Sequence, residues 1–207
     1  MGNVMLKNIQ SVIEAFYDHF LYFSDMLMVY SHVELVLDRM NDEDDGVNFF
    51  KITKAATVDS MMMCIARLLE NGGDVRSIFW LIKKCRSNKH LSKNGDELEK
   101  KLNDYELKLK EDNELEETIQ IIKLRRDKIF AHNDGKFFVD PKNDTSYLPS
   151  CKLWALQGYI QELLCMLTEE FDCNNNMQPI YDGDLNKLLP EDTRCGYWRP
   201  NMHKGLK

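Results

Sequence analysis

Hydrophobic residues recur every three or four positions in the N-terminal part of the chain. They are Leu6, Ile9, Ile13, Phe16, Phe20, Phe23 and Leu27. An α-helix completes a turn in about 3.6 residues, so this spacing places them on one face of a helix. The pattern continues to about Met40 and allows either one long helix or two helices that separate near Ser24-Asp25.

A second helical pattern has apolar residues on more than half of its circumference. They are Phe49, Ile52, Ala55, Ala56, Met62, Met63, Ile65, Ala66 and Leu69. A helix with so wide an apolar surface is expected at the centre of a bundle. Its polar exceptions, Asp59 and Arg67, are two turns apart and suit either an ion pair or the support of a functional site.

Three further helical segments are expected. Asp74 is a suitable N-cap for a helix that includes Ile78 and Ile82. The helical pattern from 96 to 130 is too long for a compact domain, so a break is expected near Asp112-Asn113. The last bundle helix contains Leu153, Leu156, Ile160, Leu163, Leu164 and Leu167.

The length and composition favour one all-α domain with an appended arm. The chain has 207 residues, of which 43% are hydrophobic, and this is enough for a core without disulfides or metals. We therefore predict a helical domain at 1–173 and a C-terminal arm at 174–207 that packs on it. No stretch shows the pattern of an export signal or a membrane span, so a cytoplasmic location without membrane contact is expected.

The six cysteines are scattered along the chain and favour reduced core thiols in a reducing compartment. The acidic segment at 41–46 resembles the start of a calcium loop. Ile52, however, stands where such a loop needs a bidentate glutamate. We therefore expect a solvated turn there, and neither a metal site nor a cofactor.

The net charge of −7 argues against a protein that binds nucleic acid with its whole surface. A local basic surface is still indicated, because the segment from Val75 to Gly95 contains several lysines and arginines but no acid. Lys83, Lys84 and Arg86 are candidates for contact with phosphate groups. The alternative is a solvated helix end, where basic residues suit the helix dipole.

The segment from Leu124 to Gly135 departs from a simple amphipathic pattern. It brings Arg125, Arg126, Lys128 and His132 together close to the end of a helix. A basic helix terminus without further function would have the same composition.

This segment resembles the signature of the HEPN superfamily, in which an arginine, a polar residue and a short spacer precede a histidine. Arg126-Asp127-Lys128 with the segment 131–134 is similar to the abortive-infection branch, and the helix at 52–70 is similar to a second landmark of that branch. The resemblance covers roughly residues 49–171. One feature of some active members, a Glu-x-x-x-Lys pair, is missing, since Met63 stands four positions after Asp59.

The resemblance implies a bundle of four or five helices that dimerises, so that the motifs of both subunits face a shared cleft. Many such proteins cleave RNA without metal, several of them as toxins or antiphage effectors. Others are inactive modules that bind a nucleotide, RNA or a protein partner. An antitoxin or a nucleotidyltransferase is a further partner that this class allows.

The residue types suit the cleavage of RNA by its own 2′-hydroxyl. Histidine can transfer protons near neutral pH, and arginine supplies a permanent charge for phosphate oxygens. We expect Arg126, Asp127 and His132 to be catalytic. The secondary candidates are Arg125, Lys128, Asn133 and Asp59, with Lys136 as a further contact of the substrate.

The choice between the two arginines stays open at this point. On a regular helix, His132 is nearly in line with Arg125, whereas Arg126 lies about 120° away. The family signature selects Arg126, and straight helix geometry favours Arg125.

Overall fold

The described part of the chain is all-α, as expected. The computed structural model describes residues 2–71, 75–127 and 148–173. Its helices are α1 (Gly2–Leu37), α2 (Val47–Leu68), α3 (Ile78–Ser87), α4 (Gly95–Glu111), α5 (Asn113–Arg125) and α7 (Ser150–Glu170), with a short 3₁₀-helix η1 (Lys89–Leu91) between α3 and α4. The expected arm at 174–207 lies outside the described residues, and the domain boundary stays a prediction.

The N-terminal pattern forms one continuous helix without a break at Ser24-Asp25. Its apolar stripe is buried, and Ile13, Phe23 and Leu27 are fully enclosed in the core. By length and composition α1 is also apolar enough to cross a membrane, a property shared by core helices and signal sequences.

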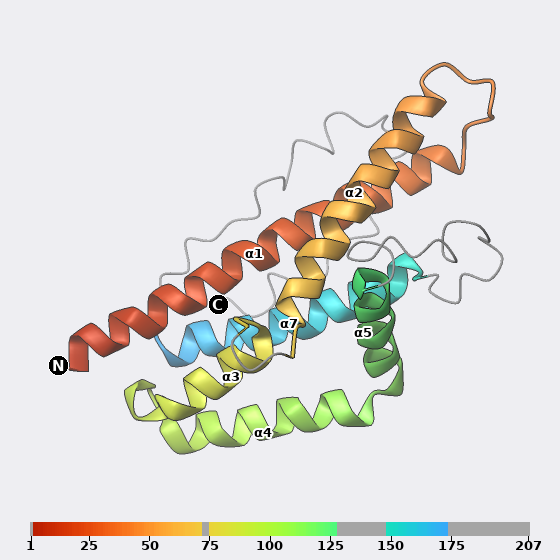
Figure 1. The fold of residues 1–207 in the computed structure, drawn as a ribbon. Coiled ribbons are helices and arrows are strands. Elements are labelled where there is room, and N and C mark those ends of the chain that lie inside the picture. Colours follow the sequence, from red (N-terminus) through yellow and green to blue (C-terminus); the bar gives the residue numbers. More distant parts are fainter. Residues whose placement is uncertain (1, 72–74, 128–147, 174–207) are drawn as a thin grey trace, which may run out of the picture.

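Three helices cover different parts of α1. In Figure 1, α2 runs back along α1 as its antiparallel neighbour, while α7 lies along α1 between about Gln10 and Ser31. Helix α5 packs between α7 and α2, and α3 packs on α1 and α4. The end of α5 is thereby placed beside the end of α2.

The first half of α2 lies outside the bundle, so its expected central position is wrong. It projects with the end of α1 as a two-helix arm beyond the other helices (Figure 1). Phe49 is 66% exposed and Ile52 is 69% exposed, and Ala55 and Ala56 on the same side are also exposed. Apolar periodicity identifies an apolar face of a helix, but it does not reveal whether another helix of the same chain packs against that face. We call these four residues the α2 apolar face.

Local side-chain caps set the limits of the middle helices. The Asp112 side chain accepts a hydrogen bond from the Leu115 amide at 3.0 Å, which confirms the expected break between α4 and α5. The N-cap of helix α3 is Ser77, whose hydroxyl accepts a hydrogen bond from the Trp80 amide, whereas the expected N-cap, Asp74, lies outside the described residues. The backbone is closely packed at the start of α4, because a Cβ on Gly95 would lie 2.9 Å from the backbone oxygen of Lys89.

Helix α7 is joined to α4 by a buried pair of tyrosines. The rings of Tyr105 and Tyr159 stack with their centroids 4.1 Å apart. Each hydroxyl donates a hydrogen bond to the backbone oxygen of the other residue. Both polar groups are therefore satisfied inside the core.

Five of the cysteines lie in the described residues, and all five are free thiols. Cys85 and Cys173 are buried core thiols as expected, and burial raises the pKa of Cys85 to about 12. Cys151 and Cys165 are exposed, so their expected core position is wrong. Both lie on outward-facing positions of α7.

Asp25 is an unusual member of the core. Its side chain is almost completely enclosed, with 1% exposure, and neither carboxylate oxygen has a hydrogen-bond partner in the described part of the chain. Burial raises the pKa of Asp25 from 3.8 to about 6. The charged form is therefore unfavourable in the folded protein.

We expect Asp25→Asn to stabilise the protein at pH 7.5 by an amount that disappears in acid. The folded protein holds this proton more tightly than the unfolded chain. Wild-type stability therefore falls as pH rises from 3.8 to about 6 and is constant above that range. The full difference is about 3 kcal/mol, from ~1.36 kcal/mol per pKa unit.

Urea denaturation of wild type and variant at several pH values measures this difference. Asp18→Asn, at an exposed position of the same helix, is the matched control and should show no such pH dependence. A constant difference between Asp25→Asn and wild type from pH 4.5 to 7.5 would contradict the prediction.

Candidate active site around Arg126

The side chain of Arg126 joins the end of α5 to the end of α2. Its Nη1 atom lies 2.6 Å from Oε2 of Glu70. Its Nε and Nη2 atoms both lie 2.8 Å from Oδ1 of Asp127. The structure therefore brings together two of the expected catalytic residues, Arg126 and Asp127, and adds Glu70.

The guanidinium of Arg126 is accessible to solvent. The Arg126 side chain is 25% exposed, and its partners Glu70 and Asp127 are 31% and 50% exposed. An arginine has five N–H donors, and the contacts with described residues use three of them. Two donors therefore remain for a ligand within this part of the structure.

The two carboxylates keep Arg126 charged. The hydrogen bond with Asp127, and then the one with Glu70, raise the pKa of Arg126 above its ordinary value. The guanidinium is thus a permanent cation, as contact with a phosphate oxygen requires. Two anionic neighbours also offset much of its charge.

The geometry of the helix changes at Arg126. Helix α5 ends at Arg125, and the chain continues through Arg126 and Asp127 in a π-helical turn. A π-type turn alters the phase at which later residues project, and such turns are frequent at functional sites. The argument from a straight helix, which favoured Arg125, therefore does not extend past this point. Arg125 is half-buried and has interactions of its own.

Four expected site residues lie outside the described residues: Lys128, His132, Asn133 and Lys136. Asp59 is described, but it does not belong to the cluster around Arg126. It stands on the exposed face of α2, about three helical turns before Glu70. Within the described ranges Asp59 forms no ion pair with Arg67.

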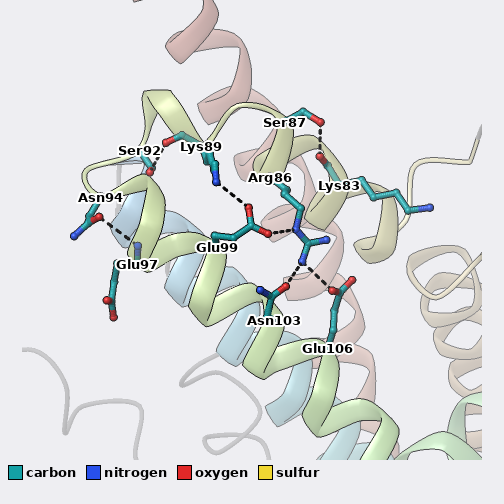
Figure 2. A network of polar contacts seen from close by, with 10 residues as sticks. All are labelled: Lys83, Arg86, Ser87, Lys89, Ser92, Asn94, Glu97, Glu99, Asn103 and Glu106. Carbon is teal, nitrogen blue, oxygen red and sulfur yellow. Dashed lines mark hydrogen bonds and ion pairs between the residues drawn. The ribbon is translucent and has the colours of Figure 1, made fainter.

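The basic segment between α2 and α4 is largely compensated by acids of other helices. Arg86 pairs with Glu99 at 2.8 Å and with Glu106 at 2.9 Å, and Lys89 pairs with Glu99 at 3.3 Å. Figure 2 shows Arg86 enclosed by these side chains and Asn103. We therefore leave Arg86 out of the candidate phosphate contacts.

Lys83 and Lys84 differ from Arg86. The Lys83 side chain extends away from the network in Figure 2. Neither lysine forms an ion pair with any residue in the described ranges. They remain candidates for contact with phosphate groups, whereas the segment as a whole is not a free cationic surface.

The remaining described residues offer no second candidate centre of this kind. No group of three or more histidine, cysteine or acidic residues in the described ranges could hold a metal ion. A shallow depression where α4 meets α5 is lined mainly by acids and does not include Arg126. Arg126 is therefore the best-defined candidate.

Sequence reasoning did not identify Glu70. One signal was present, because Glu70 follows the end of α2 and an acid there is unfavourable beside the negative end of the helix dipole. A carboxylate at such a position is stabilised when a cation lies close to it. The sequence alone could not show that Arg126 supplies it.

Comparison with known families identifies the group to which this fold and motif belong. Comparison with curated proteins and with solved structures found no match. The family model for AbiU2, a HEPN family, matches residues 17–164. This range covers most of α1, all helices from α2 to α5, much of α7, and both Arg126 and His132. The chain therefore belongs to the HEPN AbiU2 family, in the abortive-infection branch of the HEPN superfamily.

Proposed function

We propose that the protein is a metal-independent RNA endonuclease of the toxin or antiphage-defence type, acting in the cytoplasm. Membership of an abortive-infection HEPN family supports this proposal. The observation that carries it is the Arg126 guanidinium, which is charged and partly exposed, is held by two carboxylates, and has two N–H donors that no described residue uses. His132 follows in the same motif.

The proposed reaction needs only groups that the motif supplies. The 2′-oxygen of a ribose attacks the adjacent phosphorus, the bond from phosphorus to the 5′-oxygen breaks, and a 2′,3′-cyclic phosphate remains. One base removes the 2′-hydroxyl proton, and one acid protonates the leaving 5′-oxygen. His132 takes one of these roles, while Arg126 stabilises the charge that develops on the phosphate.

Asp127 supports Arg126 and does not act on the substrate in this proposal. Its Oδ1 atom accepts from both Nε and Nη2, so that one edge of the guanidinium is occupied. The remaining donors are then available to phosphate oxygens. Lys83, Lys84 and Lys136 are proposed to contact the RNA backbone further from the cleaved bond.

A dimer fits both the chemistry and the surface. One chain offers one motif histidine, whereas two copies about a two-fold axis bring two. The α2 apolar face supports such pairing, since large exposed apolar side chains often mark protein contacts. An antitoxin or a nucleotidyltransferase remains a further proposed partner that would restrain the toxin.

A second candidate function is an inactive HEPN module that binds RNA, a nucleotide or a protein. The observation that favours it is the pair of carboxylates on Arg126, which offsets the positive charge at the site. Such a module would bind RNA and leave it intact.

We expect purified protein to cleave structured RNA in the presence of EDTA, and His132→Ala to lower the rate by about 10²–10⁴-fold. Gel analysis of end-labelled RNA measures the rate and shows whether the product carries a cyclic phosphate. RNA that is shifted but uncut by the wild-type protein favours the binding module. Cleavage that stops on chelation contradicts the metal-independent mechanism.

Replacing each arginine in turn identifies the one that stabilises the phosphate. We expect Arg126→Ala to reduce the cleavage rate by about 10²–10³-fold, comparable to loss of a donor to a developing anion. Arg125→Ala should stay within a few-fold of wild type. Initial rates of both variants, with circular dichroism to verify folding, test this expectation. The reverse order of effects would assign the role to Arg125.

The protein should sediment at about twice the mass of the 24.3 kDa chain. A charge on the α2 apolar face, as in Phe49→Glu or Ile52→Glu, should convert it to a monomer and abolish cleavage, because a charge is costly to bury in an apolar contact. Val4→Glu, at another exposed apolar position, is the matched control. A wild-type monomer that still cleaves RNA would contradict the dimer.

A further inference from the structure

We infer that Glu70 is a positioning residue, which orients the Arg126 guanidinium toward the RNA phosphate without touching the RNA. This inference rests on the proposed ribonuclease function. It assigns a role to a residue outside the Arg126–His132 motif, in the segment that follows α2.

The two carboxylates on Arg126 do not act in the same way. Asp127 is the next residue in the chain, so its contact moves together with Arg126 and cannot fix the guanidinium relative to the bundle. Glu70 follows directly after the end of α2, and its 2.6 Å contact links the guanidinium to a segment outside α5. Within the described residues, only Glu70 therefore gives the guanidinium a fixed direction.

The backbone that carries Glu70 is firmly held. Leu69, the preceding residue, is completely buried, and its amide donates to the Ile65 oxygen at 3.0 Å. The Glu70 amide in turn approaches the Arg67 oxygen at 3.4 Å. The carboxylate is thus presented from backbone that two hydrogen bonds tie to the last turn of α2, as suits a supporting group.

The free side chain of arginine has many rotamers, and catalysis needs one of them. Fixing the guanidinium before the substrate arrives removes that entropic cost from the reaction step. The contact itself contributes little to folding, because partly exposed ion pairs add little to the free energy of unfolding. Loss of Glu70 should therefore affect cleavage much more than stability.

The opposite role is also testable. If Glu70 competed with the phosphate for Arg126, removal of its carboxylate would free the guanidinium. Binding of RNA would then tighten and cleavage would become faster. A positioning role predicts a lower kcat, with KM changed by less than about threefold, because the ground-state contacts with RNA stay in place.

We expect Glu70→Ala to lower kcat about 10- to 100-fold, the scale of a small misplacement of a catalytic group. Glu70→Gln should lose less of the wild-type kcat than Glu70→Ala, since its amide oxygen can still accept a hydrogen bond from Nη1. Glu116→Gln, at an exposed position on α5, is the matched control and should equal wild type. Thermal denaturation of every variant measures stability beside activity.

A double-mutant cycle separates positioning from a general structural effect. If Glu70 acts through Arg126, Glu70→Ala should have no further effect on single-turnover cleavage in an Arg126→Ala background. Equal losses in both backgrounds, or a Glu70→Ala variant as active as wild type or faster, would overturn the inference while the ribonuclease stands. Wild-type protein without any RNA cleavage would refute the proposed function, and the inference with it.

Discussion

The bundle depends on the burial of one apolar stripe along α1. Side chains such as Phe23 and Leu27 each contribute about 1.5–3 kcal/mol when they are fully removed from water. A stripe of this length cannot be covered by one partner, so α2, α3 and α7 each contact α1. Because α5 then packs on both α2 and α7, the position of Arg126 follows from the way in which α1 is covered.

The same arrangement gives the candidate site its character. Arg126 lies at a junction of two helix ends, where backbone dipoles, two carboxylates and one guanidinium are close together. The carboxylates of Glu70 and Asp127 offset part of the positive charge of Arg126, so the site differs from an open basic patch. Under the proposed function, such a group would favour a phosphate in a particular orientation, since its contacts with the described residues leave only two N–H donors.

Features that depend on neighbouring residues could be predicted from the sequence, and those that depend on distant segments could not. Helix periodicity and helix length can be read directly from the sequence, and they correctly gave the α1 stripe and the break at Asp112. The compensation of Arg86 was missed, because a segment without acids in sequence lies against Glu99 and Glu106 in space. Phe49 was misplaced for a similar reason, since periodicity cannot identify what covers an apolar face. Arg126 and Asp127 were found through a family motif, whereas Glu70 belongs to no local pattern.

The contact between Glu70 and Arg126 joins segments that are far apart along the chain. During synthesis, the acid leaves the ribosome well before the arginine does, and the two meet only when α5 docks against α2. A nascent or partly unfolded chain therefore carries the arginine without its orientation. The geometry of this contact is acquired at the same time as the tertiary fold, so the unfolded polypeptide does not possess it.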